Sequence, residues 1–267
     1  MHTDPIQIIA TLGPATTDEA LLEAMIRAGM SIARLNFSWG THVEHQQFVR
    51  LVRLTASRLH KKVPIIQDLS GPRIQRGSAH GYDPDIAVIT DTDMAGVAAL
   101  VDMDIEYIAL SFVKDADDIN DLRSHLAALG STSKIIAKIE RQEALNNLPG
   151  IIAAADGIMV ARGDLGDAIP VETLPFVKKD ILRQCRLAHT PAIVATEMLT
   201  SMIDDTDPSR ADISDIAQAV LDGTSATMLS NETAVGTNPV ETIAVMRLVV
   251  DEALRHTKTG SLVRFSV

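Results

Sequence analysis

The stretch IIAKIERQEAL, residues 135–145, begins as an apolar run of β-forming residues and continues with the spacing of a helix. Two charged side chains, Lys138 and Glu140, interrupt the apolar run. Because successive side chains of a strand point to opposite faces, residues two positions apart share a face. The pattern therefore predicts a strand followed by a helix, with an ammonium and a carboxylate side by side at the end of the strand.

The same alternation of short apolar runs and longer helical stretches recurs along the chain. Strands are predicted within QIIATLG, SIARLNFS, PIIQDLSG, EYIALSFV, KIIAKIE, GIMVARGD, PAIVATEML and SATMLSNE. Helix starts are marked by two capping-box patterns, Thr16 to Glu19 and Thr41 to Glu44. Eight strand–helix units in about 250 residues are typical of a closed (β/α)8 TIM barrel, whereas an open doubly wound sheet usually has fewer strands. The predicted fold class is therefore α/β, with residues 1–267 forming a single barrel domain.

One segment, SAHGYDPDIAVIT at residues 78–90, has neither the period of a strand nor that of a helix. It separates the third predicted strand from the helix that follows. We therefore expect a loop over residues 78–90.

The composition limits the classes of function. The net charge is −11, from 24 basic and 35 acidic residues, and no basic run is present, which argues against a nucleic-acid partner. The single cysteine, Cys185, cannot form an intrachain disulfide, which fits a reducing compartment. No apolar run approaches the ~20 residues of a membrane span, and the N-terminal MHTDPIQ lacks the regions of a signal peptide. We expect a cytoplasmic protein that acts on small molecules and has no membrane partner.

Polar residues stand at the C-terminal ends of seven predicted strands, where the active site of such a barrel lies. They are Arg34, Asn36, Ser38, Asp68, Ser111, Lys138, Glu140, Asp164, Thr196, Glu197, Ser230 and Glu232. Taken alone, Ser111, Thr196 and Ser230 are more simply explained as rim residues or helix caps. Convergence from seven strands favours a common site.

Glu140 and Asp164 follow neighbouring strands, so their carboxylates can meet on one divalent cation, and Mg²⁺ prefers such hard oxygen ligands together with water and substrate. The alternative is a salt bridge between Lys138 and these acids. Two acids beside one lysine leave an excess negative charge, which favours the metal.

Seven ordered motifs resemble the barrel domain of pyruvate kinases: ATLGPAT, ARLNFSWG, ALSFV, AKIE, DGIMVARGDLG, ATEML and AVLDGTSATMLSNETAVGTNPVE. The resemblance implies that Glu140 and Asp164 hold Mg²⁺ or Mn²⁺ and that Lys138 lies beside the transferring phosphoryl group and the enolate oxygen. It also implies a phosphate contact for Arg34. The expected substrate-binding residues are Arg34, Ala161, Gly163, Asp164, Thr196 and Ser230, with Thr196 and Arg34 also counted as catalytic.

The resemblance covers the barrel alone. Members of the family insert a mobile lid domain after the third strand, where this chain has the short segment 78–90, and they carry a C-terminal domain that this sequence does not match. The family's DTKGPEIRTG is DLSGPRIQRG here, so that Leu69, Ser70 and Gln75 replace residues expected near the nucleotide, although Arg76 could partly restore a cation. Trp39 and Glu197 replace a histidine and a glutamine.

These losses concentrate on the nucleotide side, while the residues that stabilise an enolate are retained. The main expectation is therefore a metal-dependent lyase, an aldolase or decarboxylase that binds pyruvate, phosphoenolpyruvate or a related 2-oxo acid. The alternative is a minimal pyruvate kinase, a phosphotransferase without the lid. A regulatory pseudo-enzyme is disfavoured because Lys138, Glu140 and Asp164 are all present.

Two further expectations come from the resemblance. Asn36, Ser38, Asp68 and the carbonyl of Leu69 match the family's K⁺ ligands, but Arg73 stands where K⁺-dependent members have glutamate and K⁺-independent members have lysine. A permanently charged guanidinium at that position predicts that K⁺ is not required.

The segment DPSRADISD resembles a helix start that lies at a subunit contact. Arg210 would then reach a second copy in a homo-oligomer, unless the segment is simply a surface helix capped by Ser209 or Asp212. Both alternatives stay open at the level of the sequence.

Overall fold

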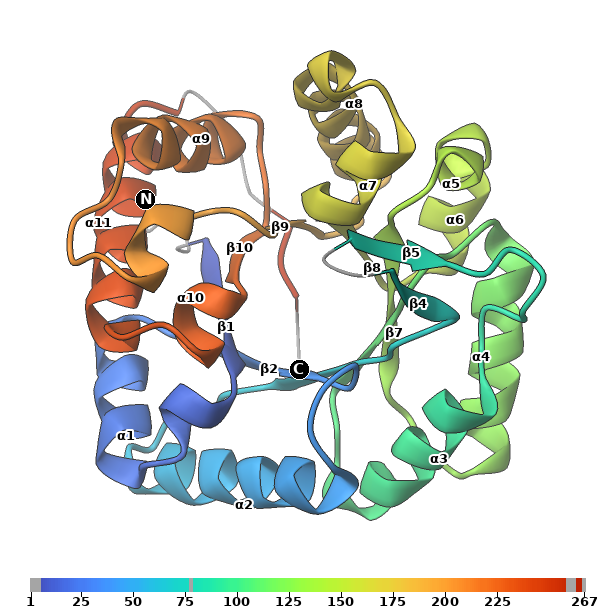
Figure 1. The fold of residues 1–267 in the computed structure, drawn as a ribbon, viewed down its shortest axis with the longest axis horizontal. Helices are drawn as coiled ribbons and strands as arrows, with labels where there is room; N and C mark the ends of the chain where they lie inside the picture. The colour runs from blue at the N-terminus through green and yellow to red at the C-terminus, as the bar shows by residue number, and fades with distance from the viewer. Residues whose placement is uncertain (1–5, 77–78, 258–262, 266–267) are drawn as a thin grey trace.

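The computed structural model describes residues 6–76, 79–257 and 263–265. Eight parallel strands close into a barrel in the order β1, β10, β9, β8, β7, β6, β3, β2, and helices surround them (Figure 1). This confirms the (β/α)8 barrel, and each predicted strand segment contains one barrel strand. The strands are β1 (Gln7–Leu12), β2 (Ile32–Asn36), β3 (Ile65–Asp68), β6 (Tyr107–Leu110), β7 (Lys134–Ile139), β8 (Gly157–Ala161), β9 (Ala192–Ala195) and β10 (Ala226–Leu229).

The outer helices are α1 (Glu19–Ala28), α2 (His42–Arg58), α3 (Asp91–Leu100), α4 (Ala116–Ala128), α5 (Gln142–Asn146), α6 (Leu148–Ala154), α7 (Arg162–Ala168), α8 (Leu174–Leu187), α9 (Arg210–Leu221), α10 (Asn231–Ala234) and α11 (Pro239–Arg255). None of the described helices combines the length and the apolar character that crossing a membrane requires.

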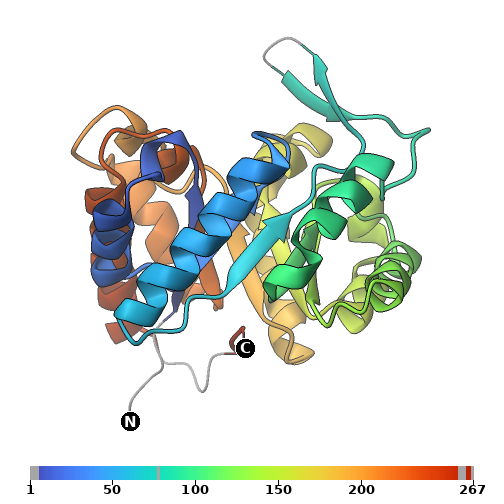
Figure 2. The same cartoon turned by 90° about the horizontal axis from the view of Figure 1, so that it is seen from below.

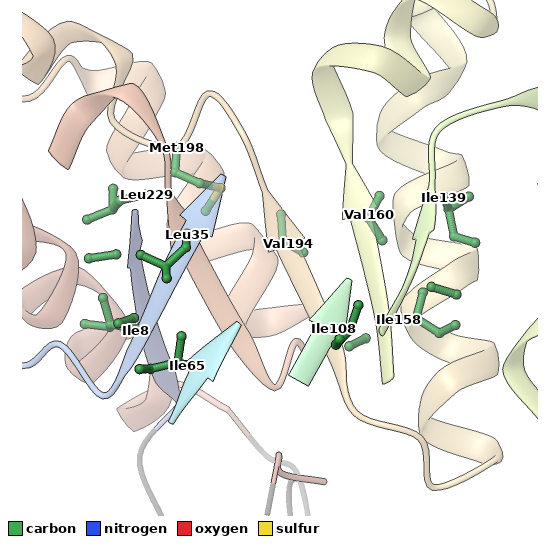
Figure 3. Close-up of a cluster of buried hydrophobic side chains, with 14 of the residues drawn as sticks. Ile8, Leu35, Ile65, Ile108, Ile139, Ile158, Val160, Val194, Met198 and Leu229 are labelled. Carbon is green, nitrogen blue, oxygen red and sulfur yellow. The ribbon is translucent and has the colours of Figure 1, made fainter. Parts of the chain in front are cut away.

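The two faces of the barrel strands supply two apolar layers. One layer is the main core, which includes Ile8, Leu35, Ile158 and Val160 from the strands (Figure 3). Helix residues such as Leu22 and Ile243 belong to the same layer. The other is a smaller cluster with Ile9, Ile32, Ile66, Met159 and Ile193. The two sets alternate along the strands, as expected when side chains point in turn to the helices and to the barrel axis.

The N-terminal end of the barrel is closed by Phe265, from a segment near the C-terminus. The backbone N–H of Phe265 donates to the Oε1 of Gln7 at 3.2 Å, and its ring lies edge-on to that of Tyr107 at 5.5 Å between centroids. A Cβ at Gly157 would come within 2.4 Å of the Phe265 ring. Because β1, β6 and β8 begin at Gln7, Tyr107 and Gly157, Phe265 lies at the end opposite the candidate site.

Residues 78–90 were expected to form a loop, and this expectation is wrong in part. β4 (Arg73–Arg76) and β5 (Ala79–Tyr82) pair antiparallel in a small hairpin that projects from one end of the barrel (Figure 2). Residues 83–90 are irregular, as predicted, and Ser78 lies outside the described residues. The sequence period missed the hairpin because a two-stranded ribbon is held by cross-strand pairing and needs no apolar face.

Of the two predicted capping boxes, the one at Thr41 and Glu44 is confirmed at the start of α2. The one at Thr16 is wrong. Thr16 closes the short 3-10 turn η1 (Pro14–Thr16) on Gly13, and α1 is capped instead by Asp18, whose carboxylate accepts the N–H of Leu21.

Candidate functional site

A cavity of about 1140 Å³ opens at the C-terminal ends of the strands. It brings together most of the residues predicted for the site, namely Arg34, Asn36, Ser38, Arg73, Lys138, Glu140, Ala161, Asp164, Thr196 and Ser230. Asp68 is not part of the lining, since it is buried beside these residues with 1% of its surface exposed. Trp39 and Ser70 also line the cavity.

Lys138 is the centre of the polar network. Its Nζ donates to the Oδ1 of Asp68 at 3.0 Å and to the Oγ of Ser111 at 2.7 Å, and lies 3.0 Å from the Oε1 of Glu140. Burial by itself would lower the pKa of this ammonium, but the charges of Asp68 and Glu140 outweigh burial and raise the pKa. Lys138 is therefore a fixed positive charge facing the cavity.

Asp68 joins Lys138 to Arg34. The Nε of Arg34 donates to the Oδ2 of Asp68 at 2.7 Å, and its Nη1 donates to the Oγ1 of Thr11 at 2.9 Å. Burial opposes ionisation of Asp68, yet the two cations hold its pKa below the ordinary value. Thr11 was not predicted as a site residue, although a threonine near the C-terminal end of the apolar run QIIATLG could have indicated one.

The predicted metal ligands Glu140 and Asp164 lie close enough to influence each other's charge. The Oε2 of Glu140 accepts the backbone N–H of Phe112 at 2.7 Å, whereas its Oε1 has the Lys138 ammonium at 3.0 Å as an ion-pair partner but makes no hydrogen bond among the described residues. The pKa of Glu140 is raised by burial and, with a smaller effect, by the charge of Asp164. A buried carboxylate oxygen with an ion-pair partner but no hydrogen bond, next to a second carboxylate, fits a hard divalent cation.

Within the described residues, no cluster of three or more histidine, cysteine, aspartate or glutamate side chains could hold a metal. A cation held by Glu140 and Asp164 would need further oxygen ligands from substrate and water, as Mg²⁺ commonly has.

Arg73 lines the cavity and pairs with Asp164. Its Nη1 and Nη2 donate to the Oδ1 and Oδ2 of Asp164 at 3.3 and 3.2 Å. In the group matched to K⁺ ligands, the Oδ1 of Asn36 accepts the backbone N–H of Ser38, and both oxygens of Asp68 are engaged by cations. The guanidinium thus compensates Asp164 directly.

The predicted carboxylate cradle lies between the end of β9 and the start of α7. Thr196 and Glu197 have left-handed backbone conformations, with φ of 66° and 53°. The backbone N–H of Gly163 donates to the Oγ1 of Thr196 at 2.9 Å, which joins the two elements. Backbone N–H groups at the start of a helix favour an anion, so the placement suits a carboxylate.

Arg162 was not predicted from the sequence, and its side chain supports the turn at Thr196 and Glu197. Its Nη2 donates to the carbonyls of Thr196 and Glu197, and its Nη1 pairs with Asp215. Lys178 also pairs with Asp215, at 3.2 Å. Because Arg162 is buried and binds carbonyls of the loop after β9, it supports the candidate site without lining the cavity.

Two other predicted polar residues have structural partners. Glu232 accepts the backbone N–H groups of Met198, Leu199 and Ser230, so its carboxylate fixes the loops after β9 and β10. Ser111 donates to the carbonyl of Leu69 and accepts from Lys138. Ser230 remains a cavity residue, and its buried Oγ has no hydrogen-bond partner in the part of the chain that the structure describes.

Comparison with known proteins shows which family this chain resembles. The family model described as "Pyruvate kinase, barrel domain" matches residues 4–95 and 79–243. Similar proteins are pyruvate kinase 2 of Synechocystis, 32% identical over 94% of this chain and 58% of the relative, and pyruvate kinase of Thermococcus litoralis, 33% identical over 90% and 68%. Plastidial pyruvate kinase 3 of Arabidopsis thaliana is 31% identical over 91% of this chain and 57% of its own length.

The chain therefore spans between about half and two thirds of the length of these relatives. The alignment with the Synechocystis protein runs over 340 positions, more than the 267 residues of this chain, so the relative has segments that are missing here. The two stretches matched by the family model overlap over residues 79–95, which include β5 and most of the short segment that stands in place of the family's lid.

The expectation of a lyase is wrong. The relatives are named pyruvate kinases, which are phosphotransferases, and the alternative of a pyruvate-kinase-like protein is the better supported one. The residues matched to enolate stabilisation misled the prediction, because a kinase that forms pyruvate and a lyase that acts on 2-oxo acids need the same enolate stabilisation. With its closed barrel and the matched segments covering most of the sequence, the chain belongs to the pyruvate kinase family.

Proposed function

We propose that this barrel transfers the phosphoryl group of phosphoenolpyruvate to a nucleoside diphosphate, ADP, in a reaction that depends on Mg²⁺ or Mn²⁺. The observation that carries the proposal is the buried Lys138 ammonium, which contacts Asp68, Ser111 and Glu140 and faces the cavity. A fixed cation at this place can stabilise the negative charge that develops on the enol oxygen as the phosphoryl group leaves.

In the proposed reaction, the bond between phosphorus and the enol oxygen breaks and its electron pair stays on that oxygen. A new bond forms between phosphorus and a terminal phosphate oxygen of ADP. The enolate then takes a proton at its methylene carbon, which gives pyruvate. Lys138 keeps its proton throughout, because Asp68 and Glu140 raise its pKa, and therefore acts by charge.

A divalent cation held by Glu140 and Asp164 would supply Lewis-acid stabilisation of the same developing charge. The chain's own contribution is to orient the substrate. Its carboxylate would lie against the start of α7, where Thr196 and the backbone around Gly163 form the cradle. Arg34, which Asp68 and Thr11 fix in place, would face the phosphoryl group.

ADP is expected to bind weakly. Ser70 and Trp39 line the cavity where the resemblance places polar partners of the nucleotide, and Gln75 replaces an arginine. Each lost charge-assisted contact is worth roughly 1.5–3 kcal/mol, so several losses should raise the dissociation constant of ADP by orders of magnitude. We infer a high KM for ADP and retained binding of phosphoenolpyruvate.

The test incubates the protein with phosphoenolpyruvate, Mg²⁺ and ADP up to millimolar concentration, and follows ATP and pyruvate by ³¹P and proton NMR. Both products should appear in equal amounts, and Lys138→Met should abolish them while the variant remains folded. The buffer contains a tetraalkylammonium salt in place of K⁺, and because Arg73 already supplies positive charge, adding K⁺ should change the rate little. Absence of ATP formation, together with failure of oxalate to bind, would remove the proposal.

A further inference from the structure

Six ionised side chains at the mouth of the barrel form a cluster of ion pairs with no net charge. Arg34 pairs with Asp68 at 2.7 Å, and Lys138 pairs with Asp68 and with Glu140, each at 3.0 Å. Arg73 pairs separately with Asp164 at 3.2 Å, and the charges of Glu140 and Asp68 also act on its guanidinium. The cluster thus contains three cations, Arg34, Arg73 and Lys138, and three carboxylates, Asp68, Glu140 and Asp164.

Arg73 differs from the other two cations in where it comes from. Arg34 and Lys138 lie on barrel strands β2 and β7, whereas Arg73 begins the hairpin strand β4. Its guanidinium stands 5.2 Å from the centre of the Phe112 ring, and its cross-strand partner Tyr82 packs against the same ring at 5.2 Å. The hairpin therefore fixes the cation that neutralises Asp164.

We propose that Arg73 makes the binding of the divalent cation conditional on the anionic substrate. The inference rests on the proposed function in one respect, since it takes Glu140 and Asp164 as the metal ligands. Without a ligand the cluster is neutral, so a divalent cation that enters alone creates an excess of two positive charges in a largely buried site. It also meets an Asp164 carboxylate whose two oxygens are already engaged by Arg73.

An anionic substrate removes both obstacles. Its negative charge compensates the metal, and its carboxylate and phosphate oxygens can complete the coordination that two protein carboxylates leave open. Binding of one ligand therefore strengthens binding of the other, and by linkage the two effects are equal. Removing the charge of Arg73 leaves the cluster with one net negative charge, so that a metal alone should bind more tightly and depend less on the anion.

The test measures binding of Mn²⁺ by electron paramagnetic resonance, with and without oxalate as a dianionic probe, and does not depend on turnover. In the wild-type protein, oxalate should tighten Mn²⁺ binding at least roughly tenfold, within the usual range of coupling between sites. In Arg73→Gln, Mn²⁺ alone should bind several-fold more tightly and the effect of oxalate should shrink by a similar factor. Arg73→Lys keeps the charge and should retain most of the coupling.

Arg123→Gln is the matched control, because it removes the same charge from the exposed pair with Asp156, outside the cluster, and should leave both constants unchanged. Circular dichroism and thermal unfolding check that each variant is folded. If folded Arg73→Gln binds Mn²⁺ no more tightly than the wild type, or shows the same effect of oxalate, the role of Arg73 is refuted. Should the wild type bind no Mn²⁺ even with oxalate, or Glu140→Gln bind it normally, the metal site of the proposed function fails instead.

Discussion

Arg162 shows how a single buried side chain can support a cavity that it does not itself line. Its guanidinium donates to the carbonyls of Thr196 and Glu197, two residues with left-handed backbone conformations. Residues other than glycine adopt this conformation at an energetic cost and keep it only when surrounding contacts determine it. The Arg162 contacts are of that kind, and the turn they hold carries the Thr196 hydroxyl.

We predict that Arg162→Lys weakens both the fold and the cradle. A lysine can still pair with Asp215, but it cannot also serve the two carbonyls, so unfolding should cost roughly 3 kcal/mol less. Chemical denaturation measures that loss, and calorimetry should show reduced affinity for oxalate in the presence of Mg²⁺.

The control for this prediction is Lys178→Met. Lys178 contacts Asp215 without contacting the turn, so this variant should lose stability but retain oxalate binding. Equal losses of oxalate affinity in the two variants would show that Arg162 has no specific effect on the turn.

The sequence predicted one class of site residue and missed another. Lys138 and Glu140 interrupt or follow an apolar strand, so the period of two along a strand was enough to place them on one face at the mouth of the barrel. Asp164 comes shortly after the next strand, so the barrel topology placed it at the same mouth. Arg162 gave no comparable signal, because its partners are backbone carbonyls that converge only after the turn at Thr196 has formed. Arg73 was recognised as a cation of the site, but its partner depended on the hairpin.

At the scale of elements, the hairpin of β4 and β5 contacts the barrel mouth through the aromatic side chain of Tyr82 as well as through Arg73. The ring of Tyr82 packs on Phe112 at 5.2 Å between centroids, and the guanidinium of Arg141 lies 4.2 Å from the centre of the Tyr82 ring. Phe112 in turn donates its backbone N–H to Glu140. Because an isolated two-stranded hairpin is marginally stable in water, these contacts should determine its order.

We therefore predict that Tyr82→Ala loosens the hairpin locally. Aromatic and cation–π contacts of this kind are worth about 0.5–1.5 kcal/mol each, so amide hydrogen exchange in β4 and β5 should accelerate by roughly tenfold. The barrel strands should exchange as in the wild type, and Tyr82→Phe should keep most of the protection, because the ring remains. Unchanged exchange in Tyr82→Ala would mean that the ring does not hold the hairpin.

The elements differed in how well the sequence predicted them, and the reason is burial. All eight barrel strands are apolar runs buried between the axis and the helices, which is the pattern that a period of two or a continuous apolar stretch detects. β5, with the sequence AHGY, has no such pattern. The capping box predicted at Thr16 did not form because the side chain of Thr16 hydrogen-bonds instead to the backbone of Gly13 in the short turn η1.

For the whole molecule, the barrel has an open end with the cavity and a closed end with Phe265. The ring of Phe265 reaches 5% exposure and joins the inner apolar cluster with Ile136 and Met159. Its contact with Gln7 links residues 258 positions apart, which no local pattern in the sequence could predict. The glycine at the start of β8 has a packing role here, because a side chain at Gly157 would occupy the place of the ring.

We predict that Phe265→Ala destabilises the whole barrel, although the residue lies at the end opposite the cavity. Deleting a buried phenylalanine ring commonly lowers the free energy of unfolding by roughly 3–5 kcal/mol. Here the ring belongs to the inner cluster at the N-terminal end of the barrel, so its loss would admit water to Tyr107 and Ile136. Chemical denaturation should show a lower midpoint with little change in slope. Under conditions in which the variant is folded, its affinity for Mn²⁺ should equal that of the wild type. Phe265→Leu, which fills part of the same space, should recover about half of the loss. A Phe265→Ala variant as stable as the wild type would show that the segment does not close the barrel in solution.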